Sequence, residues 1–246
     1  MGQDNFSTGV LQVDNFIVGI QLSSEVIIDR PGILFDCLLA HLIYQETGDL
    51  ERAHSEIPLK HEHGVWWGSY SILEAPFSKS SRSIGRRMQA IHTITSDNTI
   101  GDDGRQVRVN DVKRISNILN EYESFHTPGI YFAATGDADK VHNLLMYPDG
   151  SPRIPGIGKL HTKGVGTVES ITIEPEGHAL AGLTTVSGDV LRPIPVKSAP
   201  DIKLNGIKGY ARPLPPAWRG DAEMCYLPSE TLLFGTPDRI MDMLVT

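Results

Sequence analysis

The chain has 246 residues, of which 40% are hydrophobic and 7% aromatic, and this composition is typical of a globular protein with a sizeable core. It contains no run of about 18 apolar residues and begins without a basic or apolar leader, so we expect a cytoplasmic protein without a membrane span or signal peptide. The net charge of −8 arises in residues 1–75, which hold eleven acidic and three basic side chains. The rest of the chain sums to zero and contains cationic stretches, so nucleic-acid binding is not excluded.

The first third of the chain predicts a strand, a helix and a second strand. β-Branched and apolar residues favour a strand over 13–28. Apolar residues at helical spacing predict a helix over 33–48, which Gly48 ends. The segment VWWGSYSIL at 65–73 predicts a second strand, with its aromatic residues in the core rather than on a stacking platform.

The middle of the chain predicts an insertion followed by a strand, a helix and a strand. Residues 76–110 contain a basic run and a turn-rich acidic tip, which indicate irregular structure, and a helix is expected over 109–125. An apolar strand is expected over 129–136, a short helix behind an aspartate over 137–147, and an alternating strand over 165–175.

Without the insertion at 76–128, this order of elements predicts an α+β, ferredoxin-like domain (the RRM-like, split βαβ plan) over residues 1–176. Residues 177–246 are rich in Pro and Gly, and Asn205-Gly206 is a hairpin turn signal. We therefore expect a β-rich C-terminal extension, with a β-hairpin, packed on the core. Cys37 and Cys225 match no metal spacing and are predicted to be buried thiols.

A glycine-rich loop, PGIGKLHTKGVGTV, precedes the last predicted core strand. Four glycines enclose two lysines there, and clustered glycines allow a backbone to come close to phosphates. A P-loop requires Ser or Thr after Gly-Lys, whereas Leu160 follows Lys159. A dinucleotide-binding GxGxxG requires a following helix, whereas a strand is expected here. Neither common phosphate motif accounts for the loop.

Several of these stretches resemble one family. IGKLHTKGVGTV resembles the glycine-rich loop of the CRISPR-associated RAMP superfamily. RPGILFDCLLAHLIYQE resembles the first helix of the small Cas-five-like subunit of type IV CRISPR effector complexes, and IYFAATGDADKVHNLL resembles the strand and helix that precede its loop. The resemblance covers roughly residues 12–175 and is clearest over 129–174.

This resemblance implies a non-catalytic, guide-RNA-binding subunit of an antiviral ribonucleoprotein complex, which holds the 5′ handle of the guide RNA and caps the backbone filament. It implies Cas-seven-like backbone subunits, a large Cas-eight-like subunit and, through the complex, target DNA as partners, with neither a cofactor nor a metal. The family's RNA contact falls here on Gly156, Gly158, Lys159, His161, Thr162, Lys163, Gly164 and Gly166. Backbone N–H groups and lysines suit phosphates, while sequence contacts go to splayed single-stranded bases.

The stretch KSSRSIGRRMQAIH at 79–92 is a second candidate RNA contact. It carries cations and no acid, and each phosphate contact would add salt-dependent affinity. Its candidate residues are Lys79, Arg82, Arg86, Arg87 and His92. RAMP proteins of this kind often insert a thumb-like element here, although a solvated surface loop is the competing interpretation.

Two further functions stay open at this point. Related RAMP endoribonucleases process precursor guide RNA without metal, and His161 with Tyr131 or Lys163 offers an acid and a base for that chemistry. A nucleotide binder that uses the glycine loop for a phosphate is the other alternative. Lys60-His61-Glu62-His63 lacks a third metal ligand nearby, and Tyr210, Arg212, Trp218 and Arg219 are candidates for contact with RNA or a neighbouring subunit.

Overall fold

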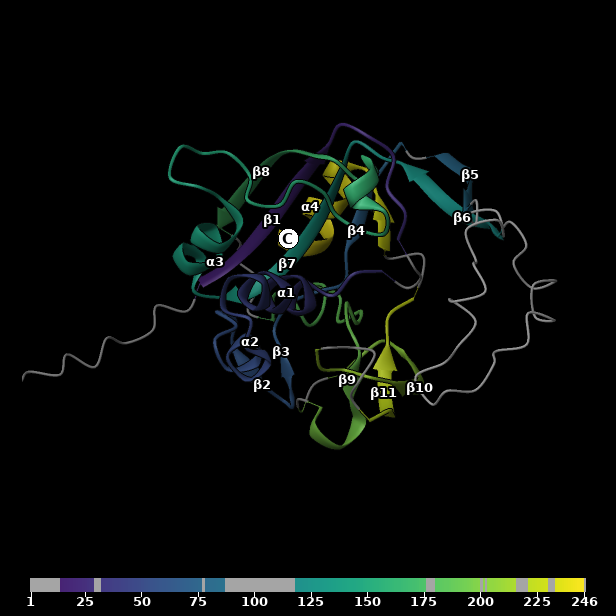
Figure 1. Ribbon diagram of the computed structural model, residues 1–246. Helices are drawn as coiled ribbons and strands as arrows, with labels where there is room; N and C mark the ends of the chain where they lie inside the picture. Colours follow the sequence, from purple (N-terminus) through teal and green to yellow (C-terminus); the bar gives the residue numbers. More distant parts are fainter. Residues whose placement is uncertain are drawn as a thin grey trace, which may run out of the picture. The chain divides into compact units, whose positions relative to one another are not determined.

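A computed structural model describes residues 14–28, 32–76, 78–86, 118–175, 180–199, 201, 203–215, 221–229 and 233–245. The chain divides into two compact units: a larger unit of Met1–Ser78 with Phe125–Thr246, and a smaller unit of Lys79–Ser124. In the part of the chain that the structure describes, no helix has the length and apolar content that a bilayer span requires. The fold is α+β (Figure 1).

A five-stranded mixed sheet forms the centre of the larger unit, with the strand order β12-β4-β7-β1-β8. The strands are β1 (Asp14–Leu22), β4 (Ile72–Glu74), β7 (Gly129–Gly136), β8 (Val168–Pro175) and β12 (Phe234–Gly235). β1 pairs antiparallel with both β7 and β8, β4 pairs antiparallel with β7, and β12 lies parallel to β4. The strand predicted over 129–136 is confirmed with its bounds, and the strand predicted over 165–175 is confirmed from Val168 onward.

Alternating residues of these strands face two different helical layers, because successive side chains of a strand point to opposite faces. α1 (Phe35–Thr47) and α3 (Ala138–Leu145) pack on one face, and α4 (Pro237–Val245) packs on the other. The first core includes Val18, Phe132, Phe35 and Val141, and the rings of Phe35 and Phe132 lie 5.0 Å apart. The second core includes Ile17, Ala133, Ile240 and Leu244.

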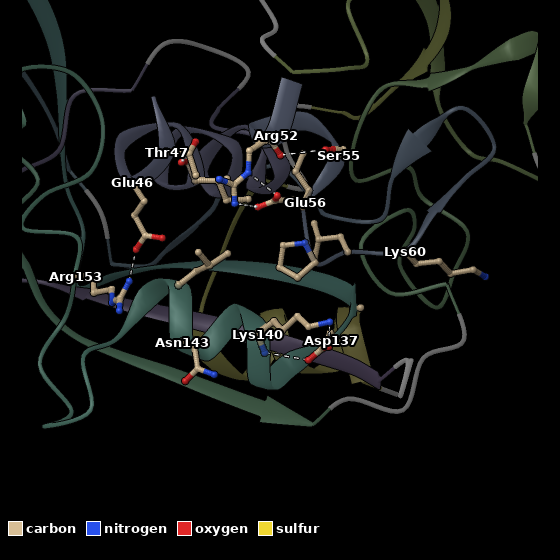
Figure 2. A pocket seen from close by; sticks show the side chains of 16 residues that line it. Glu46, Thr47, Arg52, Ser55, Glu56, Lys60, Asp137, Lys140, Asn143 and Arg153 are labelled. Atoms are coloured by element: carbon tan, nitrogen blue, oxygen red, sulfur yellow. Dashed lines mark hydrogen bonds and ion pairs between the residues drawn. The ribbon is translucent and has the colours of Figure 1, made fainter. Parts of the chain in front are cut away.

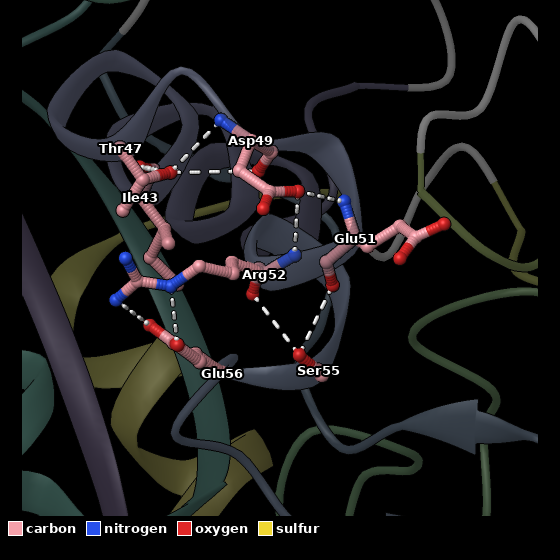
Figure 3. Close-up of polar contacts among 7 residues, drawn as sticks. All are labelled: Ile43, Thr47, Asp49, Glu51, Arg52, Ser55 and Glu56. Carbon is pink, nitrogen blue, oxygen red and sulfur yellow. Dashed lines mark hydrogen bonds and ion pairs between the residues drawn. The ribbon is translucent and has the colours of Figure 1, made fainter.

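The helix ends follow from capping chemistry. α1 ends where predicted, since Gly48 adopts the left-handed conformation (φ 66°) that glycine tolerates best. α2 (Leu50–Ser55) begins behind Asp49, whose carboxylate accepts hydrogen bonds from the amides of Glu51 at 2.8 Å and Arg52 at 3.2 Å (Figure 3). Asp137 caps α3 in the same way, through the amide of Lys140 at 3.0 Å. The helices predicted over 33–48 and 137–147 are confirmed.

The strand predicted over 65–73 is wrong as a single element. The structure has β3 (Val65–Trp66), which pairs with β2 (His61–Glu62), and then β4 from Ile72. Between them the backbone changes partners, because the amide of Ser69 donates to the carbonyl of Ala133 and the amide of Tyr70 to that of Leu191. Trp67 and Tyr70 are buried, as predicted.

The smaller unit corrects the prediction for the insertion. Ser78–Arg86 forms a strand, β5, that pairs with β6 (Ile118–His126), where irregular structure and a helix were predicted. The helix predicted over 109–125 is therefore wrong from residue 118 onward, and its first part lies outside the described residues. The hydroxyls of Ser80 and Ser124 lie 2.6 Å apart across this strand pair.

The C-terminal part forms a second, three-stranded sheet in the order β10-β11-β9. These strands are β9 (Ile194–Pro195), β10 (Ile207–Ala211) and β11 (Glu223–Leu227). The hairpin turn predicted at Asn205-Gly206 is wrong, because β10 pairs with β11, which follows it. Asn205 instead forms a bridge to Asp189, and its amide donates to the carbonyl of Gly188 at 2.8 Å.

A buried arginine ties this C-terminal part to the first helix. Arg192 and Asp36 are both fully buried, and the guanidinium donates to the carboxylate at 3.0 Å. The same guanidinium donates to the carbonyls of Trp66, Gly68 and Pro213. Burial raises the pKa of Asp36, an effect that the charge of Arg192 opposes. The Arg192 side chain thus links α1, the end of β3 with the residues that follow it, and the chain beyond β10.

Candidate nucleic-acid interface

The glycine-rich loop lies between α3 and β8, and its base is fixed to the segment that follows β1. The amide of Gly166 donates to the carbonyl of Glu25 at 2.6 Å, and the amide of Lys159 donates to that of Ile27 at 2.8 Å. The two arms of the loop also bond to each other, through the amide of Ile157 and the carbonyl of Gly166 at 2.8 Å. These backbone bonds hold the loop as a built element of the larger unit.

Three of the four glycines are required by close contacts with other residues of the chain. Gly158 has a φ of 82°, and a Cβ there would lie 2.5 Å from the carbonyl oxygen of Ile27. Gly166 has a φ of 64°, and a Cβ there would overlap the carbonyl of Ile157. At Gly156 a Cβ would lie 2.9 Å from the Cβ of His161. The close backbone approach that glycine permits is made here by the chain itself.

The tip of the loop has the opposite character. His161–Lys163 form a short 3-10 turn between Leu160 (φ 62°) and Gly164 (φ 76°). The residues from His161 to Gly164 are exposed, as is Lys159, and a Cβ at Gly164 would meet open space. The amides of His161 and Thr162 have no hydrogen-bond acceptor within the described ranges. The tip therefore presents polar backbone and cationic side chains to solvent.

Three Arg and Lys side chains lie in or beside the loop, and both lysines are exposed. Arg153 forms an ion pair with Glu46 of α1, although 107 positions separate the two residues. Lys159 and Lys163 extend from the base and the tip, and residues 151–168 contain no acid. The imidazole Nδ1 of His161 lies 3.1 Å from the carbonyl oxygen of Gly158, which holds the ring against the loop's own backbone.

The second predicted contact is only partly described. Lys79 and Arg82 lie on β5, and Lys79 forms an ion pair with Glu123 of β6 at 3.3 Å. The side chain of Arg86 and the whole of Arg87 and His92 lie outside the described residues. The run that is free of acids in the sequence therefore meets an acid supplied by the neighbouring strand.

The structure does not bring Tyr131 to His161. Tyr131 packs on the α4 face of the sheet, and its hydroxyl donates to the Glu74 carboxylate at 3.1 Å. Ile157, at the base of the glycine loop, belongs to the core on the α1 and α3 face. Burial and the Glu74 carboxylate raise the pKa of Tyr131, which makes it a poorer proton donor at neutral pH. Of the two proposed partners, Lys163 alone lies beside His161 in the 3-10 turn.

The histidines of the Lys60–His63 segment lie against tryptophans. The rings of His61 and Trp66 are 4.4 Å apart, and those of His63 and Trp67 are 6.2 Å apart. Across the described ranges, no group of three or more His, Cys, Asp or Glu side chains is placed to hold a metal ion. Cys225 is buried in β11 as predicted, whereas Cys37 in α1 is only half-buried.

A groove of about 710 Å³ between α1, α2 and α3 was not predicted from the sequence (Figure 2). Its charged rim consists of Glu46, Arg52, Glu56, Lys60, Asp137, Lys140 and Arg153. Each cation there is paired: Arg52 with Glu56 at 2.7 Å, Lys60 with Glu62 at 2.6 Å, Lys140 with Asp137 at 2.9 Å, and Arg153 with Glu46. The groove therefore has no excess of positive charge to attract a polyanion, unlike the loop tip.

Among the predicted site residues, the structure gathers Lys159, His161, Thr162, Lys163 and Gly164 on one exposed edge, above a base formed by the other glycines. Loops of this kind carry binding functions when a rigid scaffold positions them. Compared with protein-family models and with curated proteins, the chain gives no match.

Proposed function

We propose that this chain is a guide-RNA-binding, non-catalytic subunit of a type IV CRISPR ribonucleoprotein effector complex. In this role it holds the 5′ handle of the guide RNA and caps the filament of Cas-seven-like backbone subunits. The large Cas-eight-like subunit and target DNA belong to the same complex. The observation that carries the proposal is the exposed cationic tip, His161–Gly164 with Lys159, on a base fixed by backbone bonds.

The sheet supports the finer fold assignment to the ferredoxin-like, RAMP-type plan. Leaving aside β12, the strand order is β4-β7-β1-β8, and all three pairings are antiparallel. With α1 after β1 and α3 after β7, this order is the one that a split βαβ unit requires. The glycine loop occupies the connection from the second helix to the last strand of that unit, the position at which the resembling family contacts RNA.

The chemistry of the tip supports RNA as the ligand. Lysine ammonium groups and exposed amides are the groups that proteins use to bind phosphate and sugar, and they leave bases free to be read elsewhere. The net charge of −8 does not oppose this, since a polyanion responds to the local field and residues 151–168 carry no acid.

The test is purification of the tagged chain from its native cells, followed by sequencing of the bound RNA. We expect one RNA species that begins with a repeat-derived 5′ handle. The variant Lys159→Gln with Lys163→Gln should retain far less of this RNA. A matched control is Lys140→Gln with Lys197→Gln, which changes the net charge equally at exposed lysines outside the loop. Equal RNA recovery from both variants, or no bound RNA, would contradict the proposal.

The endoribonuclease alternative is separated by incubating the purified chain with repeat RNA in EDTA. Our proposal predicts intact RNA. Cleavage that is lost in the His161→Ala variant would establish the alternative instead, with Lys163 as its neighbouring cation. A nucleotide-dependent rise in melting temperature without RNA affinity would favour the nucleotide-binding alternative.

A further inference from the structure

The sheet of the C-terminal part exposes one aromatic and cationic face. On β10 and β11, Lys208 lies opposite Tyr226 and Tyr210 lies opposite Met224. Directly opposed residues of an antiparallel pair share a face, so these four side chains form one surface, here called the β10–β11 face. Tyr210 is 73% exposed, which makes it the most exposed large hydrophobic residue of the described chain, and Met224 is 41% exposed.

Packing in the hydrophobic core does not explain why an aromatic residue occupies position 210. Tyr226 on the same face is partly buried, because it packs against the hydrophobic cluster that includes Val190 and Ile194. Tyr210, one pair further along, leaves its ring in water beside an exposed methionine. Tyr210 and Met224 are paired across the two strands, so their exposed side chains form one apolar patch, and exposed apolar patches mark interaction sites.

The charged side chain of the β10–β11 face is Lys208. The ammonium of Lys208 lies 5.2 Å from the ring centroid of Tyr226. The single acid of these two strands, Glu223, pairs in register with Ala211 and so belongs to the opposite face, where it forms an ion pair with Lys197 at 2.6 Å.

An exposed aromatic ring on the same face as a lysine suits single-stranded nucleic acid. Bases of any sequence stack on aromatic side chains, and neighbouring cations hold the phosphates. Tyrosine and methionine are also enriched at protein–protein interfaces, whereas lysine is depleted there, so Lys208 is the residue of this face that favours a polyanion.

We propose that the β10–β11 face is a second binding site for single-stranded nucleic acid, in which a base stacks on Tyr210 and Lys208 contacts the adjoining phosphate. This site uses none of the glycine-loop residues, and it stands or falls separately from the function proposed for that loop.

The test measures binding of the purified full chain to two labelled strands by fluorescence anisotropy. One strand is an oligoadenylate of about twelve nucleotides, and the other is an abasic strand of equal length, which keeps the phosphates and lacks the bases. Tyr210→Ala should weaken binding of the oligoadenylate about tenfold and leave binding of the abasic strand within about twofold. Tyr210→Phe, which keeps the ring, should bind both strands as the wild type does.

Tyr44→Ala is the matched control, because Tyr44 is 47% exposed on the unrelated helix α1. It should bind both strands normally. An unchanged oligoadenylate affinity in Tyr210→Ala, or an equal loss on both strands, would overturn the proposal. Lys159→Gln with Lys163→Gln reports separately on the glycine loop, since removing phosphate contacts should weaken both strands alike.

Discussion

The base and the tip of the glycine-rich loop use the same residue type for different purposes. At the base, Gly158 and Gly166 have positive φ and lie against carbonyl groups of the chain. A side chain at either position is therefore disfavoured both by backbone strain and by a steric clash. At the tip, Gly164 also has positive φ but faces open space. The difference teaches that, within a dozen residues, glycines can both close a tightly packed base and occupy an exposed tip.

The largest expected effect is a loss of folding stability when a glycine at the base of the loop is replaced. Gly166→Ala places a Cβ on the carbonyl of Ile157 and strains φ, so we expect a loss of about 2–4 kcal/mol in the free energy of unfolding. Urea denaturation measures this loss. Gly150→Ala is the control, because Gly150 has a φ of 82° with nothing near its Cβ and so reports strain alone. Equal losses at the two positions would show that the base is not tightly packed.

The second-largest effect is expected on the affinity for RNA, with no change in folding stability. Lys159→Gln with Lys163→Gln removes two exposed cations, so we expect affinity for repeat RNA to fall about tenfold at low salt, with an unchanged melting temperature. Filter binding and thermal melting measure the two quantities. If the melting temperature falls with the affinity, the lysines support the fold rather than the ligand.

A smaller effect is expected at the tip glycine. Gly164→Ala meets no neighbouring atom, so only the left-handed φ of 76° opposes it, which costs about 1 kcal/mol. Denaturation should show this small loss, and RNA affinity should change less than in the lysine variant. A loss as large as that of Gly166→Ala would remove the distinction between base and tip.

The smallest effect is expected for His161→Ala. The ring is exposed and contacts the Gly158 carbonyl at 3.1 Å, so its removal should alter the melting temperature little. Gel electrophoresis of repeat RNA in EDTA should show no cleavage by either form. A ribose-phosphate cut made by the wild type alone would assign His161 a catalytic role.

The elements with one clear local signal were predictable from the sequence. The helix that Gly48 ends and the helix that Asp137 caps each have a stop or capping residue, and the strand at 129–136 is a short apolar run. The glycine loop also has its predicted place, directly before β8. These features depend on residues within about ten positions of each other, where local chemistry decides the conformation.

The elements that failed depend on partners distant in the chain. Residues 118–125 have spacing compatible with a helix, and pairing with β5 decides for a strand instead. The ion pair of Lys79 with Glu123 is likewise invisible in a local count of charges. The close approach of Gly158 to the carbonyl of Ile27 also joins distant parts of the chain, so the local sequence does not predict it. The groove beside α2 was not predictable either, because its walls come from three separate helices.

The most direct test of the central claim is the salt dependence of RNA binding. The slope of log affinity against log salt counts the phosphates that cations neutralise, at about 0.7 per contact for single strands. Lys159→Gln with Lys163→Gln should lower this slope by about 1.4, while Lys140→Gln with Lys197→Gln should leave it unchanged. Identical slopes for the wild type and the loop variant would contradict the assignment of RNA to the tip of the glycine-rich loop.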